Sequence, residues 1–247
     1  MSEQILFVGV AAFVASFVSG FGGFGGSYIL LIALTPIVGV KAVIPLIAVF
    51  AVCGNLSRLV IYRKHIAWKF AIQFTLASLP GVYLGARILA WIPERALLVL
   101  FALILLSAIP LRRYLKKVEF KPGLATVIGL GLIFGLISGT AAGAGMFVIA
   151  ALSSVGMAGL TLLGTDAAIG MVNAVSRVGA YISLGLLNKE LILAGLLMGA
   201  TTVPGTWLAS RAVEKMGDRA HGRVIEILIL GGGLWMLYTA IFVPEAV

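Results

Sequence analysis

Long apolar runs, separated by short polar or glycine-rich stretches, make up almost the whole chain. The runs lie at about 4–18, 27–39, 42–62, 69–90, 95–111, 123–137, 146–158, 165–187, 190–210 and 224–243. Six are about 17 to 23 residues long, which at 1.5 Å per residue suits a hydrocarbon core about 30 Å thick. The other four, of about 13 to 16 residues, are too short for a comfortable crossing. The pattern predicts an all-α integral membrane protein in which the four short helices form two re-entrant hairpins.

Glycine-rich segments interrupt both predicted hairpins. Residues 19–26 read SGFGGFGG, and residues 138–145 read SGTAAGAG. An interior glycine costs a helix about 1 kcal/mol relative to alanine, so each segment is expected to end one helix before the next begins. Glycine also lets the backbone turn and lets a ligand approach it closely. Close helix packing is the alternative interpretation of such small-residue patterns.

The second half of the chain restates the first. LPGVYLGARI at 79–88 recurs as VPGTWLASRA at 203–212, an offset of 124, and SRLVIY at 57–62 recurs as SRVGAY at 176–181, an offset of 119. The two glycine-rich segments share the second offset. Each half then holds one hairpin and three spans, and an odd number of spans turns the second half upside down. We predict inverted repeats at 1–111 and 123–247, with hairpins at 4–39 and 123–158 and a basic linker at 112–122.

Composition excludes an ordinary soluble domain. Hydrophobic residues make up 61% of the chain and charged residues 11%, with a mean hydropathy of +1.15. The net charge of +9 is carried by short loops, so it indicates membrane orientation rather than nucleic-acid binding. Basic residues gather on one predicted face, at 63–69, 112–121 and 211–223. By the positive-inside rule that face is cytoplasmic, which predicts a multi-pass inner (plasma) membrane protein with both termini on the periplasmic or extracellular side.

Inverted repeats with interrupted helices are typical of secondary transporters, whose substrate site lies near mid-membrane where the interrupted helices meet. Each helix that restarts after a break presents N–H groups and a positive dipole end, which favour an anion. The predicted anion site consists of Ser19, Gly22, Gly23, Gly25, Gly26, Ser27, Asn55, Arg58, Gly143, Gly145, Asn173 and Arg177.

Two arginines inside predicted spans carry the anion hypothesis. Asn55 and Arg58 stand three residues apart and Asn173 and Arg177 four apart, so each pair shares a helix face. A charged residue within a span costs at least about 2.5 to 3.5 kcal/mol on insertion scales, so it normally faces a cavity, a partner or a function. Snorkelling to the cytoplasmic end is the alternative for Arg58. Arg177 lies about midway along its predicted run.

Other chemistries have little support in the sequence. Ser19 or Ser138 would be the nucleophile of an intramembrane hydrolase, but no histidine lies within a predicted span to activate it. We therefore expect no enzyme, no catalytic residue, no metal and no cofactor. Asp166 and Glu190 fall near the ends of runs, where solvated or capping roles are expected rather than a proton relay. A small-anion channel is the alternative to a carrier.

These motifs resemble those of the sulfite exporter TauE/SafE family of membrane anion transporters. The resemblance rests on SGFGGFGG, on GVKAVIPLIAVFAVCGNLSRLVIYRKHIAW at 39–68, on LPGVYLGARI, and on their restatement in the second half. It implies export of a small sulfur-containing oxyanion, sulfite first, with organosulfonates and thiosulfate as related substrates. The expected partners are that anion and the lipid bilayer, with no nucleic acid. A homodimer and a permease of other specificity stay open.

Overall fold

Every regular element in the described part of the chain is an α-helix. The computed structural model describes residues 2–22, 25–93, 123–140, 144–154, 157 and 159–215, and single positions within 96–114 and 230–241. The predicted spans 95–111 and 224–243 and the linker 112–122 lie outside the described residues, single positions excepted. The described helices are α1 (Ser2–Gly22), α2 (Gly26–Val38), α3 (Val40–Tyr62), α4 (Trp68–Trp91), α6 (Leu124–Thr140), α7 (Gly145–Ser154), α8 (Gly159–Ser183), α9 (Lys189–Gly199) and α10 (Thr202–Lys215).

Both glycine-rich segments interrupt a helix, as their composition predicts. α1 ends at Gly22, and α2 begins at Gly26 after Gly25, whose φ of 101° is accessible to glycine and strained for other residues. In the second segment α6 ends at Thr140 and α7 begins at Gly145. These four helices therefore come in two pairs, each pair separated by one glycine-rich segment. α2, α6 and α7 are short, with 13, 17 and 10 residues, but α1 has 21 residues and is longer than its predicted run 4–18.

α8 differs from its predicted run. The helix spans Gly159–Ser183 rather than 165–187. Arg177 therefore lies six residues before the C-terminal end of α8, and its predicted position midway along the helix is wrong.

The predicted run 190–210 is two helices, α9 and α10, separated by residues 200 and 201. Pro204 contributes to the interruption, because it has no N–H to donate to the carbonyl of residue 200. Next to the interruption, the hydroxyl of Thr201 donates to the carbonyl of Met198 (2.7 Å) and that of Thr202 to the carbonyl of Gly199 (2.6 Å). Local side chains thus satisfy backbone acceptors in an apolar setting.

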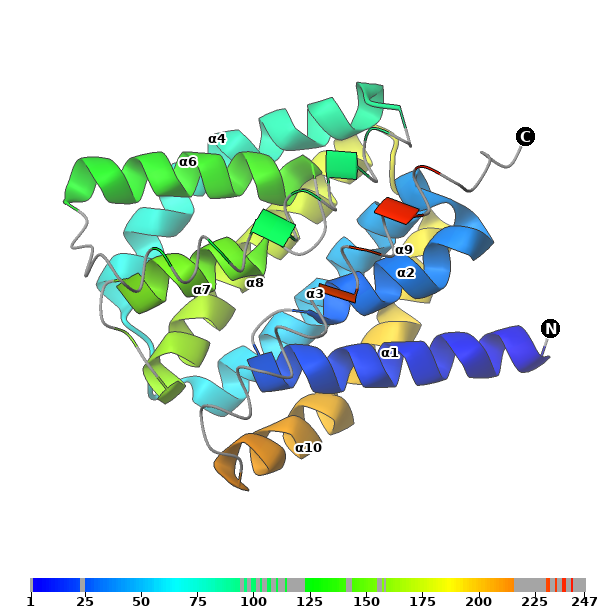
Figure 1. The fold of residues 1–247 in the computed structure, drawn as a ribbon, viewed down its shortest axis with the longest axis horizontal. Helices are drawn as coiled ribbons and strands as arrows, with labels where there is room; N and C mark the ends of the chain where they lie inside the picture. The colour runs from blue at the N-terminus through cyan, green and yellow to red at the C-terminus, as the bar shows by residue number, and fades with distance from the viewer. Residues whose placement is uncertain are drawn as a thin grey trace.

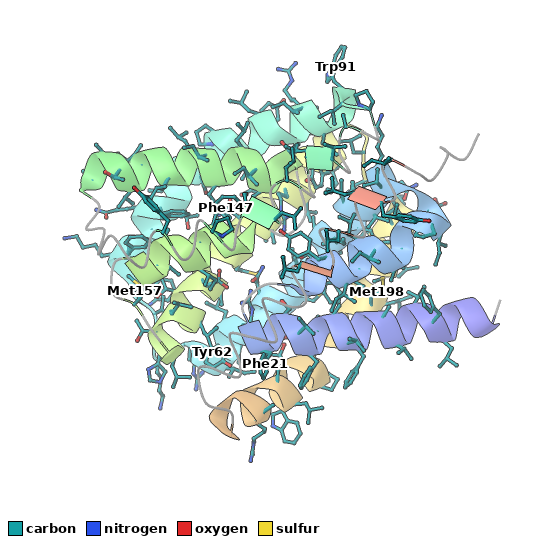
Figure 2. All side chains as sticks on the ribbon, in the orientation of Figure 1. Phe21, Tyr62, Trp91, Phe147, Met157 and Met198 are labelled. Atoms are coloured by element: carbon teal, nitrogen blue, oxygen red, sulfur yellow. The ribbon has the colours of Figure 1, made fainter. Side chains whose placement is uncertain are left out.

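Three described segments are long and apolar enough to cross a membrane: Val40–Tyr62, Trp68–Trp91 and Lys189–Ala212. Large apolar side chains cover the outside of the molecule. Trp91, the last residue of α4, is 85% exposed and projects away from the helices (Figure 2). Such extensive apolar surface suits lipid rather than water, so the chain is a membrane protein with these faces toward the bilayer.

The helices pack across the two predicted halves of the chain. α4 lies against α6 along one edge and α1 lies against α10 along the opposite edge, with α3 and α8 in contact between them (Figure 1). Glycines bring both edge pairs into backbone contact. A Cβ added to Gly139 of α6 would meet the carbonyl of Val82 in α4, and one added to Gly20 of α1 would meet the backbone of Thr206 in α10.

Two apolar clusters stabilise this arrangement. One joins α1, α2, α3 and α9, with a few residues of α4, α7 and α8, around residues such as Leu30 and Ile44. The other joins α4, α6, α7 and α8 around residues such as Phe74 and Leu152. All four of these side chains have less than 2% of their surface exposed. Because lipid is as apolar as these side chains, the clusters stabilise the fold through close van der Waals packing rather than through removal of apolar surface from water.

Candidate functional site

A small polar cavity lies between the two apolar clusters. Its volume is about 70 Å³, whereas one water molecule needs roughly 10 to 15 Å³ of such space, so a small polyatomic ion fits. Phe50 from the first cluster and Val148 from the second form part of its wall. Its polar lining consists of Ser16, Ser19, Ser27, Asn55, Arg58, Ser138, Asp166, Asn173, Arg177, Thr202 and Thr206.

The cavity brings together residues from both halves of the predicted site. Those that line it are Ser19, Ser27, Asn55, Arg58, Gly145, Asn173 and Arg177. Of the described glycines in the first break, Gly25 and Gly26 do not line it. Gly26 instead packs on α1, where an added Cβ would meet the carbonyl of Ala15. Gly23 and Gly143 lie outside the described residues, and Gly22 is described only as the last residue of α1.

Both restarted helices begin at the cavity. Ser27 lies in the first turn of α2 and Gly145 is the first residue of α7, and both line the wall. Helix N-termini present N–H groups without intrahelical partners and the positive end of the dipole. Each break therefore places a helix N-terminus, with its unpaired N–H groups, in the wall of the cavity.

A buried ion pair holds Arg58. Its Nη1 lies 2.7 Å from Oδ2 of Asp166, with the two side chains only 6% and 4% exposed, and its Nη2 donates to Oδ1 of Asn55. The snorkelling alternative for Arg58 is therefore wrong. The solvated or capping role predicted for Asp166 is also wrong, because α8 begins six residues before the predicted run and carries this residue into the packed part of the helix. Glu190 is exposed in the first turn of α9, as predicted, and accepts a hydrogen bond from Asn188 Nδ2 (3.1 Å).

Arg177 is buried with no carboxylate within ion-pair distance among the described residues. Its Nη1 donates to the carbonyl of Ser138 at 3.3 Å, and its Nε has no hydrogen-bond partner in the described part of the chain. One turn further on, Tyr181 donates to the carbonyl of Gly139 at 2.6 Å. Ser138 and Gly139 lie in the last turn of α6, where carbonyls lack intrahelical partners. The end of α6 thus contacts this face of α8 through two hydrogen bonds. Most N–H groups of the Arg177 guanidinium have no hydrogen-bond partner among the described residues.

The two asparagines connect α8 to its neighbours. Asn173 Nδ2 donates to the carbonyl of Ile169 (3.0 Å), and its Oδ1 accepts from Ser78 of α4 (3.0 Å). Asn55 of α3 fits against Gly170, where an added Cβ would lie 2.7 Å from the asparagine Oδ1. Both asparagines therefore fix the cavity wall as well as lining it.

Five polar lining residues are absent from the predicted anion site: Asp166 and the hydroxyl-bearing Ser16, Ser138, Thr202 and Thr206. A signal for the carboxylate exists in the sequence. Successive spacings of four, three and four residues place a polar or small residue on one face of α8; the residues are Asp166, Gly170, Asn173 and Arg177.

A family model described as Sulfite exporter TauE/SafE matches residues 8–236 of the 247-residue chain. The matched range includes every residue that lines the cavity. No curated protein and no solved structure matches the chain.

Proposed function

Because the chain belongs to the sulfite exporter TauE/SafE family, whose members transport sulfur anions across membranes, we propose that it exports a small sulfur-containing oxyanion from the cytoplasm. Sulfite is the first candidate, and organosulfonates and thiosulfate are the others. The cavity between the two apolar clusters is the proposed substrate site. Transport proceeds by alternating access across the inner (plasma) membrane.

The charge of Arg177 is the observation that carries this proposal. In the described lining of the cavity, Arg58 and Asp166 neutralise each other, and Arg177 is left as one positive charge. A buried charge without a counter-charge is costly, so it indicates a ligand of opposite sign. The planar guanidinium donates two parallel hydrogen bonds to an oxyanion, which fits the S–O groups of all three candidate substrates.

Neutral donors complete the proposed site. The hydroxyls of Ser19, Ser27 and Ser138 reach the same cavity from both breaks. The helix N-terminal N–H groups of α2 and α7 add further donors without adding a titratable group. An oxyanion in the cavity would thus meet donors from both halves of the chain.

The edge contacts support the inverted repeat that alternating access requires. Gly20 and Gly139 occupy corresponding positions at the offset of 119. The first packs on α10 of the second half and the second packs on α4 of the first half. Such reciprocal contacts are expected when two inverted units, each with a re-entrant hairpin, enclose a shared site.

Labelling tests the proposed orientation. Lys64 lies in the exposed basic loop after α3, and Lys189 is the exposed first residue of α9. In a Cys53→Ser background, we expect Lys64→Cys to react with an impermeant maleimide only from the cytoplasm and Lys189→Cys only from outside. Reaction of both from one side would contradict the inverted arrangement.

Flux measurements test the function itself. Purified full-length chain in proteoliposomes should show saturable sulfite efflux that is accelerated by sulfite on the opposite side. Empty liposomes and the Arg177→Gln variant are the controls. Ohmic current without counterflow would favour the channel alternative, and absence of sulfur-oxyanion flux would refute the proposal.

A further inference from the structure

We infer that the cavity selects oxyanions with a single negative charge, such as hydrogensulfite or an alkanesulfonate, and that the Asp166 carboxylate sets this limit. The inference rests on the proposed function, because it takes the cavity as the substrate site. It excludes doubly charged sulfate, thiosulfate and the sulfite dianion as preferred ligands.

The two arginines are equivalent in the sequence and different in the structure. Arg58 and Arg177 correspond at the repeat offset of 119. Asp166 neutralises the first at 2.7 Å, whereas the described partner of the second is a neutral carbonyl. At the same offset, Asp166 corresponds to Ile47, a fully buried apolar residue. The chain therefore has one carboxylate for two corresponding arginines, which halves the charge that the repeat alone would give the cavity.

Asp166 and Arg177 also share one face of α8. They are eleven residues apart, or about 16 Å along the helix axis, and both line the cavity. An anion held by the guanidinium of Arg177 thus shares an enclosed space with a fixed carboxylate. Besides Asp166 and Arg177, the described lining contains one other charged side chain, Arg58. It already forms an ion pair with Asp166.

The balance between attraction and desolvation then depends on ligand charge. Attraction to a site of net charge +1 grows in proportion to ligand charge, whereas the cost of removing an ion from water grows with its square. One negative charge makes the occupied cavity neutral. A second negative charge has no counter-charge in the described lining, because Asp166 already neutralises Arg58, so its desolvation is not offset in a medium of low dielectric constant.

Methanesulfonate and sulfate provide a matched pair of probes. Both are tetrahedral around sulfur, and they differ by a methyl group in place of a charged oxygen. With purified full-length protein in a buffer whose only other anion is too large for the cavity, we expect methanesulfonate to bind at least ~10-fold more tightly than sulfate. Isothermal titration calorimetry measures both dissociation constants. Sulfate binding as tight as methanesulfonate, or tighter, would overturn the inference.

Three variants assign the selectivity. Asp166→Asn raises the net charge of the cavity by one and should bring the two dissociation constants within ~3-fold or reverse their order. Glu190→Gln removes an exposed carboxylate outside the cavity and should leave the ratio unchanged. The double variant Arg58→Gln/Asp166→Asn removes the buried pair while keeping the net charge of the cavity, so it should retain the preference for methanesulfonate. It also provides a test if the single variant Asp166→Asn does not fold.

The outcomes separate this inference from the function on which it rests. Loss of the preference in the double variant, or an unchanged ratio in a folded Asp166→Asn variant, would overturn the inference alone. Failure of the unmodified protein to bind either probe or sulfite would overturn the proposed substrate site. A melting temperature recorded for each variant with and without ligand distinguishes misfolding from altered selectivity.

Discussion

Replacing Arg177 with glutamine should remove most of the anion affinity without unfolding the protein. Its described hydrogen bond to the Ser138 carbonyl is 3.3 Å long, and its Nε has no described partner. Little native hydrogen bonding is therefore lost. Because the substitution also removes a buried charge with no described carboxylate partner, the melting temperature without anion should not fall.

The expected loss of affinity follows from the charged hydrogen bond to the anion. Such a bond contributes about 1.5 to 3 kcal/mol, which corresponds to a roughly 10- to 150-fold increase in Kd. Arg177→Lys keeps the charge and loses the planar pair of donors, so its affinity should lie between those of the other two proteins.

Calorimetric titration with sulfite, together with thermal unfolding of the same samples, measures both quantities. An unchanged Kd combined with a lowered melting temperature would refute the reasoning, because it would show that Arg177 only holds α8 against α6.

Two further predictions concern the walls of the cavity. Arg58→Gln should lower the free energy of unfolding, measured by denaturant titration, by about 3 to 5 kcal/mol, because Asp166 stays buried without its counter-charge. Adding Asp166→Asn should recover most of that loss. No recovery in the double variant would contradict the ion-pair explanation. Gly170→Ala should cost about 1 to 3 kcal/mol, because the new Cβ would lie 2.7 Å from Asn55 Oδ1. Gly179→Ala in the same helix, with no neighbouring atom within 4 Å, should be neutral or stabilise by up to about 1 kcal/mol, and equal effects of the two alanines would argue against the proposed contact.

Features that depend on local composition could be predicted from the sequence. The two helix interruptions were predicted because each is coded by glycines within eight residues of sequence. The association of Asn173 with Arg177 was predictable for the same reason, since a spacing of four places both on one helix face. Both features follow from residues close together in the sequence and do not depend on which helix packs against them.

Features that depend on distant partners could not be predicted in the same way. Asp166 and Arg58 are 108 residues apart, so the ion pair follows from the packing of α3 on α8 and not from either local pattern. The interruption between α9 and α10 shows a different difficulty. Pro80 and Pro204 occupy corresponding motifs, yet α4 continues through the first and the chain breaks just before the second. The helix before Pro204 ends at Gly199, and after Ala200 come Thr201 and Thr202, whose hydroxyls donate to the carbonyls of Met198 and Gly199 at the break.

The pairing of α1 with α10 has a consequence for how the chain is made. Ser16 and Thr201 share a hydrogen bond at 3.0 Å across 185 residues of sequence, and Gly20 of α1 packs against Thr206 and Ala209 of α10. During translation α1 lacks its contacts with α10 until nearly all of the chain has left the ribosome. Contacts of such long range slow folding and prolong exposure of unfinished surfaces. A ribosome that stalls before residue 202 would therefore release a first helix whose α10-facing surface has no partner, a feature that membrane quality-control proteases recognise.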